Sequence, residues 1–252
     1  MKVVCIIPAR YHSTRLPNKP LAPIDGKPLI RYVYEQARKA RRPQLVLVAT
    51  DHPLIFDAVR EFGGQAVMTD AAHPTGTDRL AEVAAGLTDT DVIINVQGDE
   101  PLIPPALIDR LADAFATDEQ LQMATVMTTM AEEEYTQPGA VKVVTDRQGY
   151  ALYFSRSLIP YPRVAEAGVP VYKHIGIYAY RRDFLLQYAS MAPTPLEKAE
   201  SLEQLRALEN GYRIKVIETD CRLVGVDTPE DLERVREILN KQAIANEEGE
   251  GK

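Results

Sequence analysis

Cysteines and long apolar runs are scarce in this sequence, and each absence excludes a class of protein. Only Cys5 and Cys221 are cysteines among the 252 residues, and neither lies in a CxxC pair. The spacing therefore predicts no zinc site and no disulfide framework, and it favours a reducing compartment, the cytoplasm. Apolar runs stay well below the roughly 20 residues that cross a bilayer. We therefore expect no membrane-spanning segment.

Positive charge is scarce as well. The chain carries 29 Lys and Arg residues against 36 Asp and Glu residues, a formal net charge of −7. This acidic balance predicts no general nucleic-acid-binding surface, although a local group of cations can still bind a small anion. The chain also lacks an internal repeat or a low-complexity linker. We therefore predict a single domain over residues 1–244 and a disordered tail over residues 245–252.

Apolar runs and amphipathic segments alternate in the first half of the chain. The predicted strands are Val3–Pro8, Leu45–Ala49, Ala66–Met68 and Asp91–Val96. The predicted helices are Pro28–Ala40, Pro53–Phe62, Thr77–Gly86 and Pro105–Phe115. Strands that are apolar on both faces, each followed by a helix, are typical of a parallel sheet covered on both sides. The pattern predicts an α/β fold with a mostly parallel central sheet over about residues 1–120.

The rhythm changes after about residue 120. The predicted strands here are Met123–Thr129, Val141–Val144, Ala151–Phe154, Tyr172–Tyr180 and Arg213–Glu218. The predicted helices are Asp183–Met191, Pro195–Glu209 and Thr228–Leu239. Residues 160–170 are rich in Pro, Gly and Ala, which predicts a mobile loop. We expect a mixed-sheet lobe over about residues 121–220, built into the second half of the same domain.

The loop after the first predicted strand carries three cations and no glycine. In IIPARYHSTRLPNKPL, residues 6–21, the cations are Arg10, Arg15 and Lys19. Ligands of an open parallel sheet bind beyond the carboxyl ends of its strands. Cationic side chains there suit a polyanion, because each phosphate oxygen accepts a charge-assisted hydrogen bond. The alternative is an ordinary solvated turn whose charges face water.

Two carboxylates occupy similar positions. Asp99 in NVQGDEP follows a predicted parallel strand, and Asp227 in GVDTPED precedes a predicted helix. A carboxylate beside phosphates is repelled unless a divalent cation lies between them. The pair therefore predicts a magnesium site. The alternatives are a turn residue for Asp99 and a helix-start acid for Asp227.

Six motifs, in chain order, carry a family resemblance over about residues 3–239. They are PARYHSTRLPNKPL, NVQGDEP, YALYFSR, KHIGIYAY, LEQLRALENG and GVDTPEDLERV. Together they resemble the 3-deoxy-manno-octulosonate (Kdo) cytidylyltransferases, the CMP-Kdo synthetases of bacteria that make lipopolysaccharide. NVQGDEP is shared with other sugar nucleotidyltransferases, and its combination with YALYFSR and LEQLR separates this family from them. The resemblance implies a GT-A-like, Rossmann-type nucleotidyltransferase that joins CTP to Kdo, releases pyrophosphate, uses Mg²⁺ and forms a homodimer.

The resemblance also implies a set of charged catalytic residues and a nucleotide site. Three cations would hold the triphosphate and two carboxylates would carry magnesium: Arg10, Arg15, Lys19, Asp99 and Asp227. The nucleotide site would contain the same three cations together with Pro8, Ala9, Thr75, Gly76 and Arg79. Thr75, in HPTGTDR, stands where the family more often has Ser, and it keeps the hydroxyl group.

A sugar-acid site is implied in the same way. Its residues would be Gln97, Arg156, His174, Tyr178, Glu203 and Gln204. Arg156 is suited to the carboxylate of the sugar, because a guanidinium binds a carboxylate in a bidentate fork. Without the resemblance, the simpler interpretations are a structural histidine at His174, a packing residue at Tyr178 and a surface acid at Glu203.

The sequence leaves three alternatives open. The first is a cytidylyltransferase for a related acid sugar, neuraminate or the 8-amino analogue of Kdo. The second is a non-catalytic nucleotide-sugar-binding module, and the third is a structural partner protein. No histidine or cysteine stands as an obvious nucleophile, so we expect direct displacement rather than a covalent intermediate. The aromatic residues of YALYFSR fit a subunit interface and a core equally well.

Overall fold

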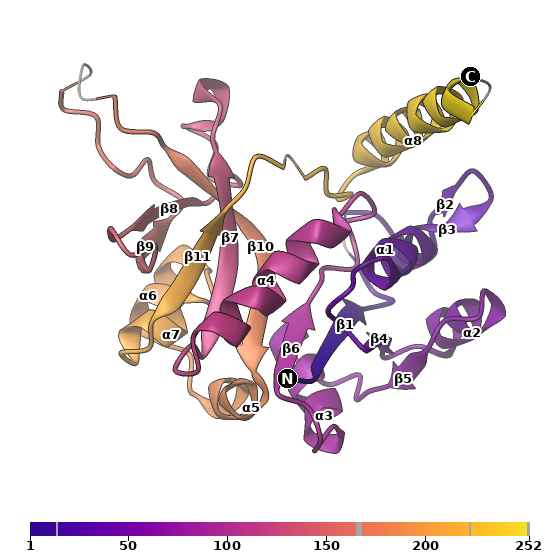
Figure 1. The fold of residues 1–252 in the computed structure, drawn as a ribbon, viewed down its shortest axis with the longest axis horizontal. Helices are drawn as coiled ribbons and strands as arrows, with labels where there is room; N and C mark the ends of the chain where they lie inside the picture. The colour runs from indigo at the N-terminus through magenta and orange to yellow at the C-terminus, as the bar shows by residue number, and fades with distance from the viewer. Residues whose placement is uncertain (14, 165–167, 222, 251–252) are drawn as a thin grey trace.

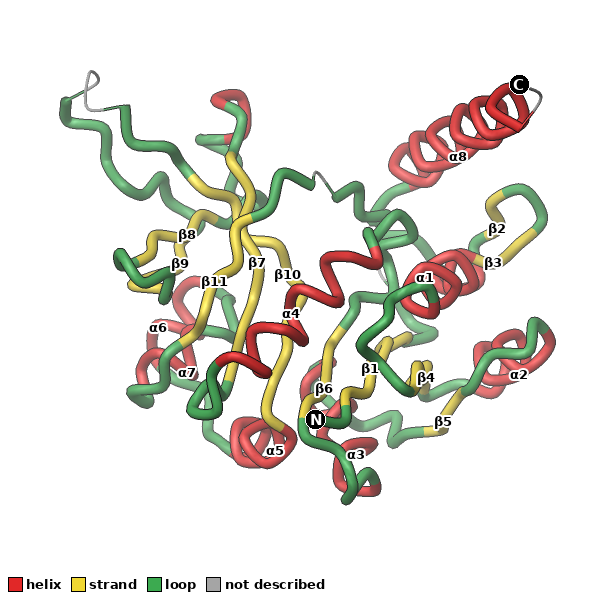
Figure 2. Tube along the Cα trace, viewed as in Figure 1, coloured by secondary structure: helices red, strands yellow, loops and turns green. Residues whose placement is uncertain are grey.

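The computed structural model describes residues 1–13, 15–164, 168–221 and 223–250. Within these ranges a nine-stranded sheet runs through the molecule, with helices on both faces (Figure 1, Figure 2). In spatial order its main strands are β11 (Ile214–Glu218), β7 (Met123–Thr129), β10 (Tyr172–Arg181), β6 (Val92–Asn95), β1 (Val3–Ala9), β4 (Leu45–Thr50) and β5 (Ala66–Met68). A separate two-stranded sheet is formed by β2 (Pro23–Ile24) and β3 (Lys27–Pro28).

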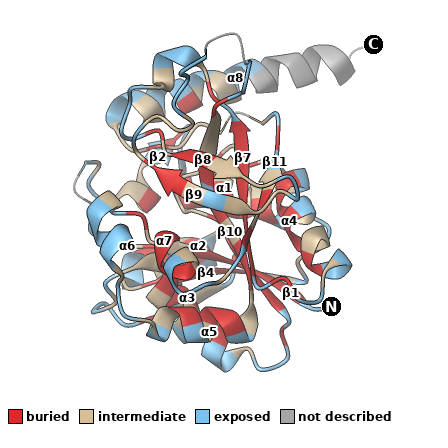
Figure 3. Cartoon of the chain, turned by 90° about the vertical axis from the view of Figure 1, so that its left-hand side faces the viewer, coloured by how far each residue is buried: buried red, intermediate tan, exposed pale blue. Residues whose placement is uncertain are grey.

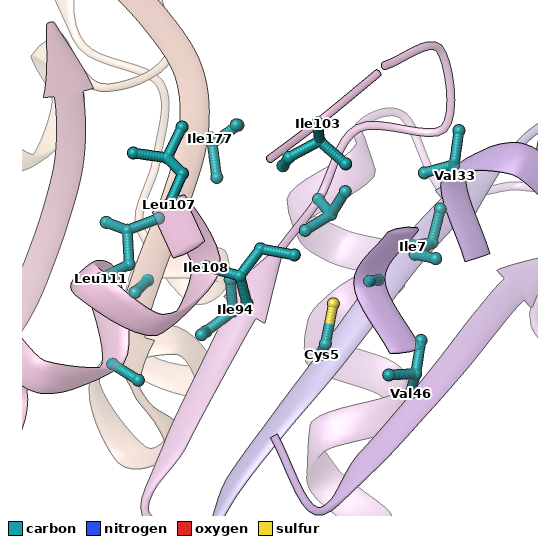
Figure 4. Close-up of a cluster of buried hydrophobic side chains, with 14 of the residues drawn as sticks. Cys5, Ile7, Val33, Val46, Ile94, Ile103, Leu107, Ile108, Leu111 and Ile177 are labelled. Carbon is teal, nitrogen blue, oxygen red and sulfur yellow. The ribbon is translucent and has the colours of Figure 1, made fainter. Parts of the chain in front are cut away.

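The first half of the chain forms the parallel part of the sheet. β1 runs parallel to both β4 and β6, and β5 continues the sheet beyond β4. The helices on one face are α1 (Leu29–Arg38), α2 (Pro53–Glu61) and α4 (Pro105–Thr117), and those on the other are α3 (Gly76–Gly86) and α5 (Arg182–Ser190). Strands covered on both sides need apolar residues at every position, which explains the unbroken apolar runs. Figure 4 shows Cys5 in the cluster between β1 and the covering helices, where it is fully buried.

The predicted mixed-sheet lobe is confirmed, and it continues the same sheet. β10 is antiparallel to β6 on one side and to β7 on the other, and β11 is parallel to β7. β8 (Lys142–Thr145) pairs with the beginning of β10 and with β9 (Ala151–Ser155). Buried residues follow these strands, whereas the outer sides of the helices are exposed (Figure 3). One continuous sheet therefore connects the two halves of the domain.

The helix predicted over Pro195–Glu209 is wrong in one respect, because the structure divides it in two. α6 (Pro195–Glu200) ends at Ser201, which has a left-handed φ of 50°, and α7 (Leu205–Glu209) begins after a turn. The carbonyl groups of Glu200 and Ser201 accept hydrogen bonds from the distant side chain of Arg156. A tertiary contact of this kind leaves no periodic signal in the sequence, so the break was not predicted.

The last helix is longer than predicted. α8 (Pro229–Glu250) begins after Thr228, whose hydroxyl accepts a hydrogen bond from the backbone N–H of Asp231, as expected for a capping residue. It continues past Leu239 and includes residues 245–250, which the sequence predicted as a disordered tail. Residues 240–250 include two Ala, one Gln and three Glu residues, which are good helix formers. Residues 251–252 of the predicted tail and 165–167 of the predicted mobile loop lie outside the described residues. None of the described helices combines the length and apolar character needed to cross a bilayer.

Candidate active site

Two loops meet at the carboxyl edge of the sheet, one after β1 and one after β6. The two strands are parallel neighbours, so the segments that follow them leave the sheet at the same edge. Gly98 permits their close approach, since a Cβ atom there would lie 2.7 Å from the carbonyl oxygen of Pro8. A cavity of about 190 Å³ lies between the loops. Its lining residues are Pro8, Ala9, Arg10, His12, Ser13, Lys19, Pro20, Gln97, Gly98 and Asp99.

The structure brings both predicted carboxylates to the cationic loop. The Nζ atom of Lys19 lies 2.6 Å from Oδ2 of Asp99 and 3.0 Å from Oδ1 of Asp227. Nη2 of Arg15 lies 3.0 Å from the same oxygen of Asp227. Three segments that are far apart in the sequence therefore share one ionic cluster, as the expected site requires.

The backbone around Lys19 is shaped by a tight turn. Asn18 adopts a left-handed conformation with φ 53°, and a short 3₁₀ helix, η1 (Lys19–Leu21), follows it. The backbone N–H of Leu21 donates to the carbonyl oxygen of Asn18 at 2.8 Å. Burial lowers the pKa of Lys19, but the carboxylates of Asp99 and Asp227 outweigh it and hold the pKa above its ordinary value. Lys19 is therefore cationic at neutral pH.

Arg10 and Arg79 lie near each other in different surroundings. Arg10 lines the cavity, and its Nη2 atom is buried without a hydrogen-bond partner among the described residues. Arg79 is fully buried and does not line this cavity; it donates hydrogen bonds to Thr69 and, at 3.1 Å, to Asp51. Burial lowers the pKa of Arg79, opposed by Asp51 and reinforced by Arg10. Arg10 is thus placed for a ligand, whereas Arg79 supports the frame behind it.

Thr75 and Gly76, two residues expected in the nucleotide site, lie at the beginning of α3. The Thr75 hydroxyl accepts from the backbone N–H of Asp78 at 3.2 Å, and the Asp78 carboxylate accepts from the backbone N–H of Thr75 at 3.1 Å. This capping box fixes the first turn of the helix. A Cβ atom at Gly76 would lie 3.8 Å from Cγ of Pro8, in ordinary contact. The beginning of α3 therefore packs beside the end of β1.

Gln97 reaches across to an irregularity in β10. Its Nε2 atom donates to the carbonyl oxygen of Gly176 at 3.0 Å. The register of β10 against β7 shifts between Ile175 and Tyr178, which frees that carbonyl group from regular pairing. The hydroxyl of Thr125, on β7, lies 3.2 Å from the carbonyl oxygen of Ile175 and supports the same irregularity. β10 therefore bends where the expected sugar site begins.

His174 and Tyr178 lie on either side of this bulge. The Nε2 atom of His174 lies 2.9 Å from the hydroxyl oxygen of Thr125. The centroid of its ring lies 4.9 Å from that of Phe154 and 5.5 Å from that of Tyr178. Burial lowers the pKa of His174 to about 3, so the ring is neutral at physiological pH. Burial and the charge of Glu203 raise the pKa of Tyr178, which keeps its hydroxyl protonated.

Glu203 and Gln204 occupy the turn between α6 and α7. Oε1 of Glu203 and Nε2 of Gln204 are buried, and neither has a partner within the described part of the chain. The hydroxyl of Tyr188 donates to the carbonyl oxygen of Glu203 at 2.6 Å and fixes the turn. Burial raises the pKa of Glu203, and a hydrogen bond between its carboxylate and the side chain of Thr77 opposes that rise. An orphaned buried acceptor and an orphaned donor on adjacent residues are what a polyhydroxylated ligand would satisfy.

Arg156 contacts three carbonyl groups of the chain. Its Nε, Nη1 and Nη2 atoms donate to the carbonyl oxygens of Glu200 at 2.6 Å, Pro138 at 2.9 Å and Ser201 at 3.1 Å. These bonds tie β9 to the end of α6, directly before the turn that carries Glu203. Three of the five N–H donors of Arg156 therefore hold the chain around the end of α6.

The side chains of the site fit a magnesium ion that is held by two carboxylates. The described residues contain no group of three or more His, Cys, Asp or Glu side chains placed to hold a metal. Magnesium commonly uses one or two carboxylates and completes its shell with substrate phosphates and water. Asp99 and Asp227 supply two carboxylates, both within 3.0 Å of one ammonium nitrogen. This oxygen-only set suits a metal shared with a phosphate ligand.

Comparison with known proteins identifies the family. A family model described as cytidylyltransferase matches residues 4–217. The chain is 56% identical over 252 residues to the 3-deoxy-manno-octulosonate cytidylyltransferase of Geotalea uraniireducens, covering 96% of this chain and all of that protein. It is 54% identical to the protein of that name from Geobacter metallireducens, covering 97% of this chain and again all of the relative. The chain belongs to the 3-deoxy-manno-octulosonate cytidylyltransferase family.

A solved structure agrees with this assignment. The structure of CMP:2-keto-3-deoxy-manno-octonic acid synthetase complexed with CTP matches with a TM-score of 0.92 at 46% identity. The match covers 96% of this chain and 100% of that one. The predicted family, the predicted fold class and the assignment as a nucleotidyltransferase enzyme are therefore confirmed. The third alternative, a protein with a purely structural role, is excluded because the chain belongs to a family of enzymes.

Glu100 is a half-buried acid that the sequence analysis missed. Burial and the charges of Asp99 and Asp227 raise its pKa to about 8. Its Oε2 atom is buried and makes no hydrogen bond to any described residue. Gly225 leaves room for it, because a Cβ atom there would lie 3.1 Å from Oε1. The available signal was its place beside Asp99 in NVQGDEP, which by itself does not separate a buried acid from an exposed turn residue.

Proposed function

We propose that this cytidylyltransferase joins the cytidylyl group of CTP to Kdo, forming CMP-Kdo for lipopolysaccharide synthesis and releasing pyrophosphate. The observation that carries this proposal is the meeting of Lys19 and Arg15 with Asp99 and Asp227 at the carboxyl edge of the sheet. Relatives that this chain matches over nearly its whole length carry the name of the same activity.

The proposed reaction is a direct displacement at the α-phosphorus of CTP. The anomeric hydroxyl of the sugar loses its proton to water and its oxygen forms a bond to phosphorus. The bond to the bridging oxygen breaks, and pyrophosphate leaves with that electron pair. Arg10, Arg15 and Lys19 stabilise the negative charge that develops on the leaving group. Cys5 is buried, with its pKa raised by burial to about 12, and it is not available as a nucleophile. The neutral ring of His174 is bonded to Thr125.

We assign magnesium to Asp99 and Asp227. When bound there, the metal would supply positive charge to the α-phosphate and to the attacking oxygen, favouring loss of its proton. The chain's own part is to hold the two carboxylates together and to set three cations around the phosphates. Support comes from the ion pairs of Lys19 with both acids.

The sugar-acid site is proposed to lie along β10 and the α6–α7 turn. Its residues are Gln97, His174, Tyr178, Glu203 and Gln204. Arg156 is assigned a positioning role, because it donates to the carbonyl oxygens of Glu200 and Ser201 where that turn begins. Buried orphaned atoms at Glu203 and Gln204 support the site. The hydroxyl groups of the sugar would satisfy them.

Arg156→Ala is expected to weaken sugar-acid binding more than it slows turnover. Loss of the contacts with Glu200 and Ser201 releases the turn, so the KM for Kdo should rise about tenfold or more, the scale of one charge-assisted hydrogen bond. The KM for CTP should change less than about threefold. Steady-state kinetics with each substrate varied in turn separates the two. A KM for Kdo equal to that of the wild type would remove Arg156 from this role.

A panel of substrates tests the proposed function. Pyrophosphate release is measured with each nucleoside triphosphate, with Kdo, its 8-amino analogue and neuraminate as acceptors, in magnesium and in EDTA. We expect release with CTP and Kdo in magnesium and none with EDTA. Release of pyrophosphate only with another acceptor would show that Kdo is not the substrate. Tight CTP binding without release of pyrophosphate under any condition would favour the non-catalytic module.

A homodimer is proposed from exposed apolar side chains in the lobe. Leu152 is 62% exposed, Val164 60% and Val169 61%, on β9 and the connection that follows it. Burying such residues against a second copy would remove them from water. Light scattering measures the mass directly, and a monomer at micromolar concentration would contradict the proposal.

The cytoplasm is proposed as the location. Cys5 and Cys221 are free cysteines, which suits a reducing compartment. CTP, the proposed substrate, is an intracellular nucleotide. Cell fractionation with an antibody to the chain tests this location, and recovery in the membrane or periplasmic fraction would contradict it.

A further inference from the structure

The ammonium group of Lys19 occupies a particular point of the site. It lies between Asp99 and Asp227, at 2.6 and 3.0 Å from their oxygens, and its side chain is only 17% exposed. The left-handed residue Asn18 and the 3₁₀ turn after it fix the backbone from which the side chain extends. A strong, well-shielded positive charge therefore holds two acids that would otherwise repel each other.

A divalent cation bound by the same two oxygens would compete with the ammonium for them. Magnesium binds carboxylate oxygens at about 2.0–2.1 Å, so a metal shared by the two oxygens that Lys19 contacts would crowd the ammonium. The positive charges of the ammonium and of the metal, so close together, repel each other strongly in a partly buried site. The ammonium must therefore move away when the metal enters.

We propose that Lys19 is an internal countercharge that holds the two carboxylates together until a divalent cation replaces it. Replacement frees the ammonium to contact phosphate in the adjoining cavity, which Arg10 also lines. Lys19 thus contacts the two carboxylates before the metal binds and a phosphate of the nucleotide afterwards. This inference rests on the proposed metal site of the cytidylyltransferase, and it adds an exchange between lysine and metal at that site.

The exchange is tested by metal binding without any substrate. Free Mn²⁺ is counted by electron paramagnetic resonance during titration of the nucleotide-free protein at pH 7.5 and low salt. Lys19→Met removes the competing charge, and we expect Mn²⁺ to bind about tenfold tighter than to the wild type. Lys19→Arg keeps the charge, so it should bind Mn²⁺ no more tightly than the wild type does.

Arg15→Met is the matched control. Arg15 contacts Asp227 alone and its side chain is 68% exposed, so its removal should tighten Mn²⁺ binding less than about threefold. Circular dichroism checks that each variant is folded. Equal or weaker binding by Lys19→Met than by the folded wild type would overturn the proposal, and so would equal gains from Lys19→Met and Arg15→Met. Because the titration contains neither CTP nor sugar, its result is independent of whether cytidylyl transfer occurs.

Discussion

Asp99→Asn is expected to lower the rate of pyrophosphate release by a factor of at least about 10², the scale of losing one strong transition-state contact. The variant removes one of the two carboxylates assigned to magnesium and also one partner of Lys19. The amide is nearly the same size, so the loops should keep their positions. Turnover is measured with saturating CTP and Kdo in magnesium.

Asp57→Asn is the control for this prediction. Asp57 is an exposed acid on α2, away from the ionic cluster. Its replacement should leave the rate within about twofold of the wild type, because isolated surface charges contribute little. A folded Asp99→Asn enzyme with near-normal turnover would remove Asp99 from the mechanism.

Gly98→Ala is expected to damage both activity and stability. The added Cβ would lie 2.7 Å from the carbonyl oxygen of Pro8, which belongs to the backbone of a central strand and cannot turn aside. The loop that carries Asp99 must therefore shift away from the loop that carries Lys19. We expect turnover to fall about tenfold or more, since small displacements in a site cost that much. The free energy of unfolding should fall by about 1–3 kcal/mol, as for other overpacked positions.

Gly86→Ala is the matched control for the glycine. A Cβ at Gly86, at the end of α3, meets nothing within 4 Å. This replacement should leave turnover unchanged and should raise the free energy of unfolding by about 0.5–1 kcal/mol, because alanine favours the helix. Urea unfolding and pyrophosphate release measure both variants. A Gly98→Ala enzyme that matched the control in both would contradict the close approach of the two loops.

Strand direction explains which residues could be expected to lie together. Arg15, Lys19 and Asp99 follow parallel strands, and parallel neighbours present their carboxyl ends at one edge, so strand order alone brings them together. Asp227 was placed by its motif at a helix start, and the structure brings it to the same edge. The mostly parallel sheet could be predicted as well, because strands that are covered by helices on both faces have unbroken apolar sequences.

The features that the sequence did not reveal depend on partners that are remote in the chain. Arg156 contacts carbonyl groups of Pro138, Glu200 and Ser201, and every residue has a carbonyl group, so no residue type marks those partners. The break in the helix at Ser201 has the same origin. The burial of Glu100 depends on Gly225, far along the chain, leaving space beside it. Such contacts become visible only when the packing is known.

The place of β10 in the sheet has a consequence for how substrates enter. Its backbone is hydrogen-bonded to β6 along one edge and to β7 along the other, so it fastens the nucleotide half to the lobe. Swinging the halves apart as rigid bodies would break one of these ladders along its length. Substrates must therefore enter past the connections at the sheet's rim, with no hinge between the halves.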